Sequence, residues 1–302
     1  DNRRLNSFKW GCRMIISIAS GKGGTGKTTI AINLALTLAE TESVCFMDCD
    51  VEEPNAHLFL KPVLEGSAQV TVPIPIVDEE QCNRCGRCGE ICAFNAILPL
   101  GNHILTFPEL CHGCGGCTLL CPTGAIREEP LEIGVVEWGH AGSISHTHGR
   151  LKIGSPLAPP IVKAVKNRNQ NMPEGTISII DAPPGTSCPV VASVSDSDFC
   201  LLVTEPTPFG LHDLTLAVDM VRALQVPFGV VINRAGLGNG GLVNYCKAKN
   251  IPMLAEIPFE RKYAACYAKG GRLVEEFPEM KEAFQSLWQT ICATAPEGTK
   301  LP

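Results

Sequence analysis

The fold is decided by the stretch Gly21-Lys22-Gly23-Gly24-Thr25-Gly26-Lys27-Thr28-Thr29. It matches both the Walker A phosphate loop and the Gly-x-Gly-x-x-Gly fingerprint of dinucleotide-binding folds. Asp48 and Asp50 follow at about the distance of a ribose-binding acid, so spacing alone does not separate the two motifs. Lys27 and Thr28 separate them, because an ammonium and a hydroxyl at a helix start suit phosphate and Mg²⁺. The stretch therefore predicts a nucleotide site in which Lys27 and backbone N–H groups hold the phosphates and Thr28 ligates Mg²⁺.

The flanks of this loop predict an α/β fold. An apolar run at residues 14–19 precedes the loop, and a helical apolar pattern at residues 30–40 follows it. Further apolar runs, each typical of a buried strand, lie at residues 43–50, 176–181, 199–204 and 227–233. Helical patterns alternate with them at residues 211–224, 242–249 and 262–293. This alternation predicts a P-loop NTPase with a mostly parallel sheet and helices on both faces.

Composition narrows the class of protein. The chain has 302 residues, of which 45% are hydrophobic and 19% charged, so we expect a globular protein with a sizeable core. Its net charge of −6 gives no general attraction for nucleic acid or anionic lipid. No apolar run approaches the roughly 18–20 residues of a membrane span. We therefore expect a cytoplasmic protein without nucleic-acid or membrane partners, in which Met14 is the natural start and residues 1–13 are an N-terminal tail.

Cysteine spacing is the second decisive feature. Of 16 cysteines, eight lie between residues 82 and 121, in two runs of the form Cys-x-x-Cys-x-x-Cys-x-x-x-Cys. This is the run of bacterial ferredoxins, whose first three cysteines hold one cluster while the fourth holds the other. Zinc is the alternative, but it usually takes paired Cys-x-x-Cys knuckles separated by a longer loop. The runs predict two [4Fe-4S] clusters, one held by Cys82, Cys85, Cys88 and Cys121, the other by Cys111, Cys114, Cys117 and Cys92.

The repeat also sets the expected domains. Two similar runs imply an internal duplication with pseudo-twofold symmetry, here within an inserted small α+β ferredoxin-like domain. Ala93 stands where a ferredoxin usually has Pro, a change that removes no ligand. We expect a tail, a first part of the ATPase domain, the inserted ferredoxin domain and a second part of the ATPase domain, at residues 1–13, 14–77, 78–129 and 130–302 respectively.

Lys22 in the phosphate loop carries a family resemblance. It resembles the signature lysine of the MinD/ParA/Mrp and nitrogenase iron protein class, whose deviant Walker A motif the stretch matches. The resemblance covers nearly all of residues 14–302 outside the insertion. In that class this lysine reaches the phosphates of the facing subunit. The resemblance therefore implies ATP or ADP with Mg²⁺ as cofactors, and a homodimer with nucleotide at its interface.

The same resemblance implies roles for residues at the ends of other strands. Asp50 resembles the acid of the first switch, which orients the attacking water, and Asp181 the Walker B acid, which holds Mg²⁺ through water. Thr28, Asp50 and Asp181 are thus the expected Mg²⁺ residues, directly or through water. Nucleotide-base contacts are implied for two pairs of residues: Asn233 with Arg234, and Pro258 with Phe259. With Mg²⁺, we expect hydrolysis to be carried by Lys22, Lys27 and Asp50.

Eight cysteines lie outside the runs, and we expect most to be small buried hydrophobic residues, at positions 12, 45, 49, 188, 200, 246, 266 and 292. Cys188 lies just past the second switch, at a position similar to a bridging-cluster ligand of the nitrogenase iron protein. A metal there is a hypothesis for which no second cysteine is evident. His140, His146 and His148 are expected on a solvated loop, and the alternative is a metal-handling patch with Cys188.

Taken together, the motifs resemble MinD-superfamily ATPases with an inserted ferredoxin domain, known mainly from anaerobes. They predict ATP binding and hydrolysis coupled to electron transfer through two [4Fe-4S] clusters to a redox partner. The alternative is an ATP-dependent metallocluster assembly or insertion factor, an Mrp-like carrier or scaffold with a cluster-accepting partner. The C-terminal region lacks the Cys-x-x-Cys pair of Mrp-type carriers.

Overall fold

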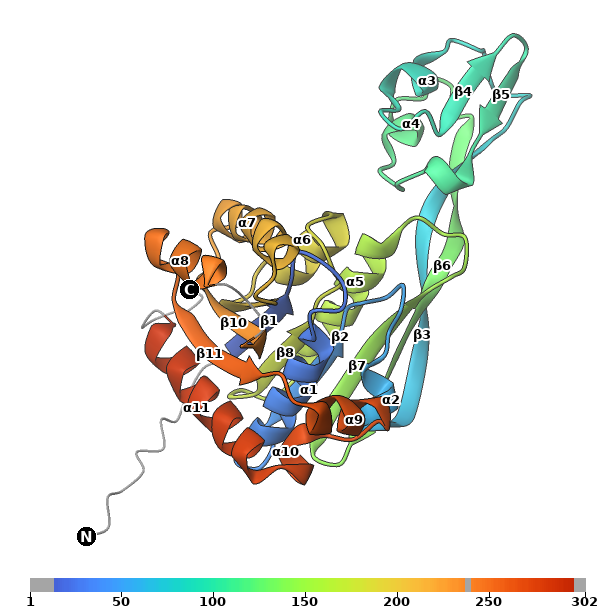
Figure 1. Ribbon diagram of the computed structural model, residues 1–302. Helices are drawn as coiled ribbons and strands as arrows, with labels where there is room; N and C mark the ends of the chain where they lie inside the picture. Colours follow the sequence, from blue (N-terminus) through green and yellow to red (C-terminus); the bar gives the residue numbers. More distant parts are fainter. Residues whose placement is uncertain (1–13, 237–239, 296–302) are drawn as a thin grey trace.

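A nine-stranded sheet forms the centre of the structure, in the order β11-β10-β9-β1-β8-β2-β7-β6-β3 (Figure 1). The computed structural model describes residues 14–236 and 240–295, so the predicted tail lies outside the described residues. Neighbouring strands from β11 to β7 are parallel, whereas β6 is antiparallel to both β7 and β3. The sheet is thus mostly parallel, as predicted. Its strands are β1 (Met14–Ala19), β2 (Val44–Asp48), β3 (Val63–Val77), β6 (Ile126–Ala141), β7 (Ile144–Leu151), β8 (Ile177–Asp181), β9 (Phe199–Thr204), β10 (Phe228–Ala235) and β11 (Met253–Pro258).

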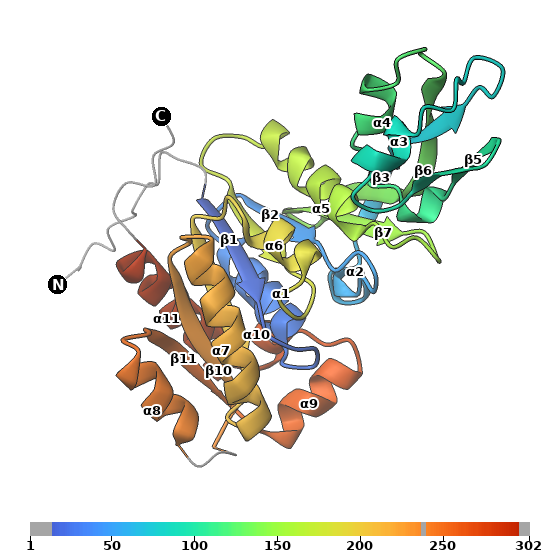
Figure 2. The same cartoon turned by 90° about the horizontal axis from the view of Figure 1, so that it is seen from above.

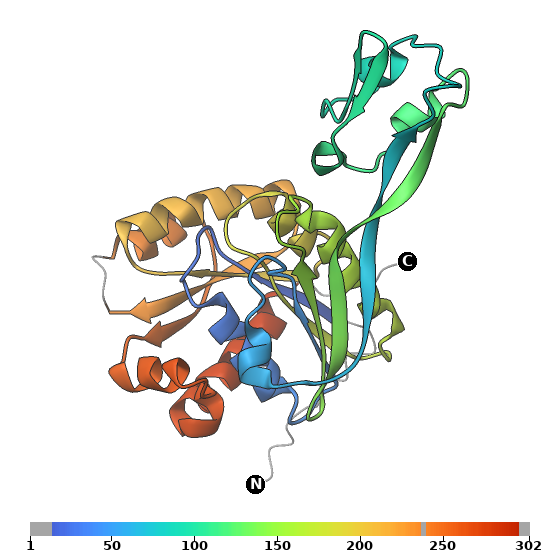
Figure 3. The same cartoon turned by 90° about the vertical axis from the view of Figure 1, so that its right-hand side faces the viewer.

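Helices cover both faces of the sheet (Figure 3). On one face lie α1 (Lys27–Leu38), α9 (Arg261–Ala268), α10 (Leu273–Glu276) and α11 (Pro278–Thr294). On the other lie α5 (Ala158–Asn167), α6 (Cys188–Val194), α7 (Pro208–Ala223) and α8 (Gly241–Ala248). Local sequence sets several helix starts. In α7, for example, the Thr207 side chain accepts a hydrogen bond from the Gly210 N–H, and Pro208 follows at the first helical position.

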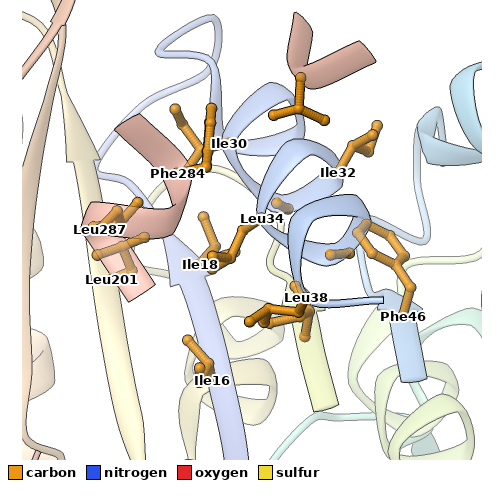
Figure 4. Close-up of a cluster of buried hydrophobic side chains, with 14 of the residues drawn as sticks. Ile16, Ile18, Ile30, Ile32, Leu34, Leu38, Phe46, Leu201, Phe284 and Leu287 are labelled. Atoms are coloured by element: carbon orange, nitrogen blue, oxygen red, sulfur yellow. The ribbon is translucent and has the colours of Figure 1, made fainter. Parts of the chain in front are cut away.

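The largest core lies between the sheet and the layer formed by α1 and α11 (Figure 4). Fully burying one such side chain stabilises the fold by about 1.5–3 kcal/mol. Because both β1 and α1 contribute side chains to this core, it holds the loop between them in place. Its labelled members are Ile16, Ile18, Ile30, Ile32, Leu34, Leu38, Phe46, Leu201, Phe284 and Leu287.

A long two-stranded arm departs from the sequence-based expectation. β3 and β6 pair antiparallel from Val63 opposite His140 to Val77 opposite Ile126, and they carry the cysteine-rich segment away from the body (Figures 1 and 3). The sequence patterns predict neither these strands nor β7. β3 and β6 have solvent over much of both faces and contain Pro, Gly and Glu, so no apolar run marks them.

The segment at the end of the arm is a small α+β unit. It contains a two-stranded sheet and three short helical turns, and Figure 2 shows it on the side of the molecule opposite α8. We call residues 78–125 the tip unit. Its elements are α3 (Arg87–Ile91), β4 (Ile97–Leu100), β5 (His103–Thr106), a 3₁₀ turn (Pro108–Leu110) and α4 (Gly116–Leu119). Two further short elements of the body are α2 (Ala56–Leu60) and a 3₁₀ turn (Arg168–Asn171).

Candidate functional site

The phosphate loop joins β1 to α1 and closes against β10. Gly26 has φ +91°, and a Cβ placed on it would lie 2.3 Å from Asn233 Nδ2. That amide donates a hydrogen bond of 2.8 Å to the Thr25 carbonyl oxygen. Glycine is therefore required at position 26 by both conformation and space. Asn233, predicted to contact the base, also positions the phosphate loop in this structure.

Parallel pairing brings acids from two strand ends to this loop. Asp48 on β2 lies opposite Asp181 on β8. Burial raises the pKa of Asp181 to about 7, while the nearby Thr28 hydroxyl and the charge of Lys27 act to lower it. Among the residues that the structure describes, neither Asp181 carboxylate oxygen has a hydrogen-bond partner. Burial also raises the pKa of Asp50 to about 6 and lowers that of Lys27. A buried carboxylate without a donor fits a hard divalent cation such as Mg²⁺.

Asp48 is a site residue that the sequence analysis did not assign. Its Oδ1 accepts from the Asp50 N–H, and its Oδ2 accepts from the N–H groups of Asn55 and Ala56, each at 3.1 Å. Burial and the charge of Asp181 raise the pKa of Asp48 well above its usual range. One carboxylate thus organises the loop that follows β2 and the start of α2. A buried acid at the last position of an apolar strand was the available signal.

The segment after β8 is tied to β1 and the phosphate loop. The Ala182 N–H donates to the Ile18 carbonyl and the Gly185 N–H to the Ser20 carbonyl, both at 3.0 Å. Cys188 follows as the first residue of α6 and is exposed. The predicted second switch therefore contacts the nucleotide loop directly.

Lys22 lies beside another residue that sequence reasoning missed. Glu205 follows β9 and is buried. Its Oε2 lies 3.9 Å from Lys22 Nζ, and its Oε1 lies 2.7 Å from Arg234 Nη1. One carboxylate therefore lies beside both Lys22 and Arg234, two residues that are predicted to contact the nucleotide. The side chains come together because β9 lies between β1 and β10, a relation that no local pattern shows.

The predicted base contacts come from adjacent strands. Ala235 on β10 lies opposite Pro258 on β11, and the Phe259 N–H donates to the Ala235 carbonyl at 3.3 Å. Parallel pairing thus brings Asn233 and Arg234 to the same edge as the half-exposed Phe259.

In the tip unit, the cysteines gather around two cavities. One cavity is lined by one set of four cysteines, and a second cavity by the other set. The two sets match the predicted ligand sets, including the exchange of the fourth cysteine between runs. They are Cys82, Cys85, Cys88 and Cys121, and Cys92, Cys111, Cys114 and Cys117.

Backbone N–H groups lie beside two of these thiols. The Ala96 N–H points to Cys92 Sγ at 3.2 Å and the Gly113 N–H to Cys111 Sγ at 3.4 Å, as expected for thiolate ligands stabilised by backbone donors. Within residues 14–236 and 240–295, no three His, Cys, Asp or Glu side chains converge to hold a single metal ion.

The histidine prediction is wrong in part. His146 and His148 lie on β7 and are buried, and His140 lies on β6 with its Nδ1 2.9 Å from Glu65. His146 Nε2 is 3.2 Å from His148 Nδ1, and His148 stacks on His57. The two-residue period of a strand sends both β7 histidines to one face, so they do not form a solvated loop. In the described residues they form no metal-holding group with Cys188.

The other predicted buried cysteines follow expectation where the structure describes them. Cys12 lies outside the described residues, and Cys292 is partly buried. Those that are buried are Cys45, Cys49, Cys200, Cys246 and Cys266.

A phosphate loop after the inner strand β1, with acids at the ends of nearby strands, defines a P-loop nucleotide-binding α/β protein. The chain belongs to the CobQ/CobB/MinD/ParA nucleotide-binding domain family, whose sequence profile matches residues 16–274. An uncharacterized protein of Methanocaldococcus jannaschii is 30% identical over 285 residues, covering 93% of this chain and 97% of that protein. In the described residues, none of the helices combines the length and apolar character needed to cross a membrane.

Two further comparisons bear on the site. The iron-sulfur cluster carrier protein of Pyrococcus horikoshii is 24% identical over 306 residues, covering 94% of this chain and 86% of that protein. The septum site-determining protein MinD of the same organism, solved with Mg-ADP, superposes with a TM-score of 0.56 at 21% identity, covering 96% of this chain and all of that one. This second likeness shows the shared fold.

Proposed function

We propose that this chain is an ATP-dependent carrier or insertion factor that passes iron-sulfur clusters or related metalloclusters to an acceptor protein. The observation that carries the proposal is the combination, in one chain, of a phosphate loop with eight cysteines set in two groups of four at the end of an arm. Relatives named iron-sulfur cluster carrier proteins align over most of the chain and support it.

The nucleotide half of the proposal uses the loop between β1 and α1. Backbone N–H groups of residues 21–29 and Lys27 bind the phosphates, and Thr28 and Asp181 hold Mg²⁺ directly or through water. Asp50 orients the attacking water. These groups lie together at the carboxyl edge of the sheet, where doubly wound α/β proteins bind ligands.

The remaining nucleotide contacts involve the base and a second copy of the chain. Asn233 and Arg234 contact the base, which Pro258 and Phe259 cover. Lys22 reaches the phosphates of a facing copy, so nucleotide lies at a homodimer interface. Glu205 must release Lys22 before that contact forms, because the carboxylate lies beside the lysine in the structure.

For the cysteine half, we take residues 78–129 as an inserted two-cluster ferredoxin domain between ATPase parts 14–77 and 130–302. The two lined cavities support this assignment, and each set of four cysteines would hold one [4Fe-4S] cluster. When bound, such clusters supply one-electron redox chemistry at potentials tuned by nearby N–H donors. Cys188, exposed beside the second switch, is a candidate contact for cargo.

The two halves are joined by a short path along the chain. Asp48 holds the N–H groups of Asn55 and Ala56, α2 ends at Leu60, and β3 begins at Val63. A change in the loop after β2 on nucleotide binding therefore acts at the foot of the arm. We propose this as the route by which nucleotide state affects cluster release.

Transfer of labelled iron tests the proposal. The holoprotein, loaded anaerobically with ⁵⁵Fe, is mixed with an apo-ferredoxin acceptor without nucleotide, with MgADP and with MgATP. We expect MgATP to accelerate the appearance of label in the acceptor, and Lys27→Ala to abolish the acceleration. Cys188→Ala should slow transfer without lowering the initial label. An acceptor that receives no label under any condition contradicts the carrier proposal.

A second candidate, an ATP-gated electron carrier, is favoured by one observation. All eight run cysteines line the two cavities, so the chain has ligands for two resident clusters without using Cys188. In the same experiment, an electron carrier keeps its label. After reduction it passes electrons to an oxidised acceptor ferredoxin at a rate that depends on nucleotide.

A further inference from the structure

The tip unit has two cysteine sets, and they meet the arm at different points. The inner set is Cys92, Cys111, Cys114 and Cys117, and the outer set is Cys82, Cys85, Cys88 and Cys121. Pro73 and Pro75 of β3 also line the cavity of the inner set. The cavity of the outer set instead reaches Val77 and Ile126, the last pair of the arm. The outer set therefore lies farther out along the arm.

The two cysteine runs repeat the same backbone turn after their fourth cysteine. In the first run φ is +53° at Asn95, whose N–H donates to the Cys92 carbonyl at 3.2 Å. In the second run φ is +68° at Gly124, whose N–H donates to the Cys121 carbonyl at 3.3 Å. Side chains at equal places in the two runs can therefore be compared directly.

Side chains at two such places form an aromatic cover over the inner set. Phe94 and His112 both line the inner cavity and stack face to face, with ring centroids 3.6 Å apart and ring planes 12° apart. In the outer cavity the equal places hold Thr123 and Asn83. A hydroxyl and an amide cannot stack in this way, and Thr123 Oγ1 lies instead 3.7 Å from Cys121 Sγ. The duplication is thus kept in the backbone and broken in what covers each site.

The first cysteine of each run differs in the same direction. Cys111 is buried, with its Sγ 4.0 Å from the Pro73 carbonyl oxygen, whereas Cys82 is partly exposed. Cys85 and Cys114, the second of each run, are exposed alike. An incoming thiol or chelator must reach iron to replace a cysteine. The stacked rings exclude water and leave it less room at the inner set, whereas the outer set offers a polar approach.

We infer that the outer set gives up its cluster readily, while the cover formed by Phe94 and His112 makes the inner set retain its own. The inference deepens the proposed function and rests on it, because both sets must hold clusters. In the exchange, four bonds between iron and outer-set thiolates break as four bonds to acceptor thiolates form. The protons of the acceptor thiols pass to the released cysteines, so no electron is gained or lost.

Loss of ⁵⁵Fe from the full, anaerobically loaded holoprotein to excess EDTA tests the inference. We expect two phases of about four irons each, with rates that differ at least about threefold. Phe94→Thr with His112→Asn gives the inner set the outer side chains and should quicken the slow phase about three- to tenfold. Asn83→His with Thr123→Phe adds the aromatic pair to the outer set and should slow the fast phase by a similar factor.

Two further variants separate the stack from other effects. His112→Phe keeps two stacked rings without the imidazole, so both phases should keep their rates. Leu100→Thr with His103→Asn makes the same kinds of change at exposed positions of the tip unit outside both cavities, and should alter neither phase. All variants should begin with about eight irons, which shows that the tip unit is folded.

Three results would overturn the inference: release in a single phase, a slow phase unchanged by Phe94→Thr with His112→Asn, or a slow phase quickened by His112→Phe. In the acceptor assay, transfer should stop after about half of the label, and transfer of all of it also overturns the inference. Two phases with EDTA but no label in the acceptor contradict the carrier proposal and leave the difference in retention standing. Label in the acceptor from a chain with a single phase contradicts the inference alone.

Discussion

Lys22 Nζ lies 3.9 Å from Glu205 Oε2, and this contact restrains the lysine that the family resemblance assigns to phosphate binding. The Lys22 side chain is about one-third exposed, so solvent screens the pair, and such contacts contribute about 0.2–1 kcal/mol. The contact is therefore weak enough for a nucleotide phosphate to displace. It is also strong enough to shift nucleotide affinity measurably.

Replacing Glu205 by Gln should tighten ATP binding about two- to fivefold, because an amide holds an ammonium less strongly than a carboxylate does. Lys22→Gln should lower the ATPase rate at least about tenfold, since it removes a charge aimed at the phosphates. Fluorescent-nucleotide titration and phosphate release measure the two effects. Glu260→Gln, which also removes a surface ion pair with a lysine, is the matched control. Weaker ATP binding by Glu205→Gln would show that the carboxylate helps binding.

Mg²⁺ affinity should rise with pH. The pKa of Asp50 is raised to about 6 and that of Asp181 to about 7 from 3.8, chiefly by burial. Between 3.8 and those values the folded chain holds protons that the unfolded chain releases, so nucleotide-free stability falls as pH rises from about 4 to about 7. Mg²⁺ must displace the Asp181 proton, so its affinity with ADP bound should rise by up to about tenfold per pH unit from pH 5.5 to about 7 and level off above that.

Calorimetry in buffers of different ionisation heats measures the proton release that accompanies Mg²⁺ binding. Asp181→Asn should abolish it together with most of the affinity. Glu52→Gln removes an exposed charge on the loop after β2 and should leave both unchanged. A pH-independent affinity in the unmodified chain would remove Asp181 from the Mg²⁺ site.

Iron content should follow the two cysteine sets independently. With both sites filled, the anaerobically purified chain should hold about eight irons, four for each [4Fe-4S] cluster. Cys82→Ala with Cys85→Ala should leave about four, as should Cys111→Ala with Cys114→Ala, because each pair belongs to one cavity. Cys188→Ala should retain all of them. Zinc in place of iron under these conditions contradicts the cluster assignment.

The buried histidine pair should make the fold sensitive to acid. Burial, with help from His148 and His57, lowers the pKa of His146 from 6.5 to about 3. Between these values the unfolded chain binds a proton that the folded chain does not, so stability falls as pH drops below 6.5. The free energy of unfolding of the unmodified chain, relative to that of the His146→Leu variant, should fall by up to about 1.4 kcal/mol for each pH unit below 6.5. Urea unfolding at several pH values measures it, and a constant difference would contradict the prediction.

Sequence alone determined the features that are encoded within short stretches. Residues 21–29 predicted the phosphate loop, and apolar runs predicted β1, β2, β8, β9 and β10 with small errors at their ends. The cysteine spacing predicted which four thiols share a cavity, because the repeat itself constrains how a run wraps. The loop and the strands depend on contacts between near neighbours in the chain, which local sequence patterns record. The cysteine sets join two separate runs and follow from the repeated spacing.

The tertiary structure decided what depends on distant segments. Strand order placed Asp48 beside Asp181 and gave Glu205 both Lys22 and Arg234. Antiparallel pairing made residues 63–77 and 126–141 into an arm, and pairing with β2 buried the β7 histidines. These residues are far apart in the chain, and only the hydrogen-bonded register of the sheet fixes their distances. No local periodicity carries that register, which is why these relations became visible only in the folded molecule.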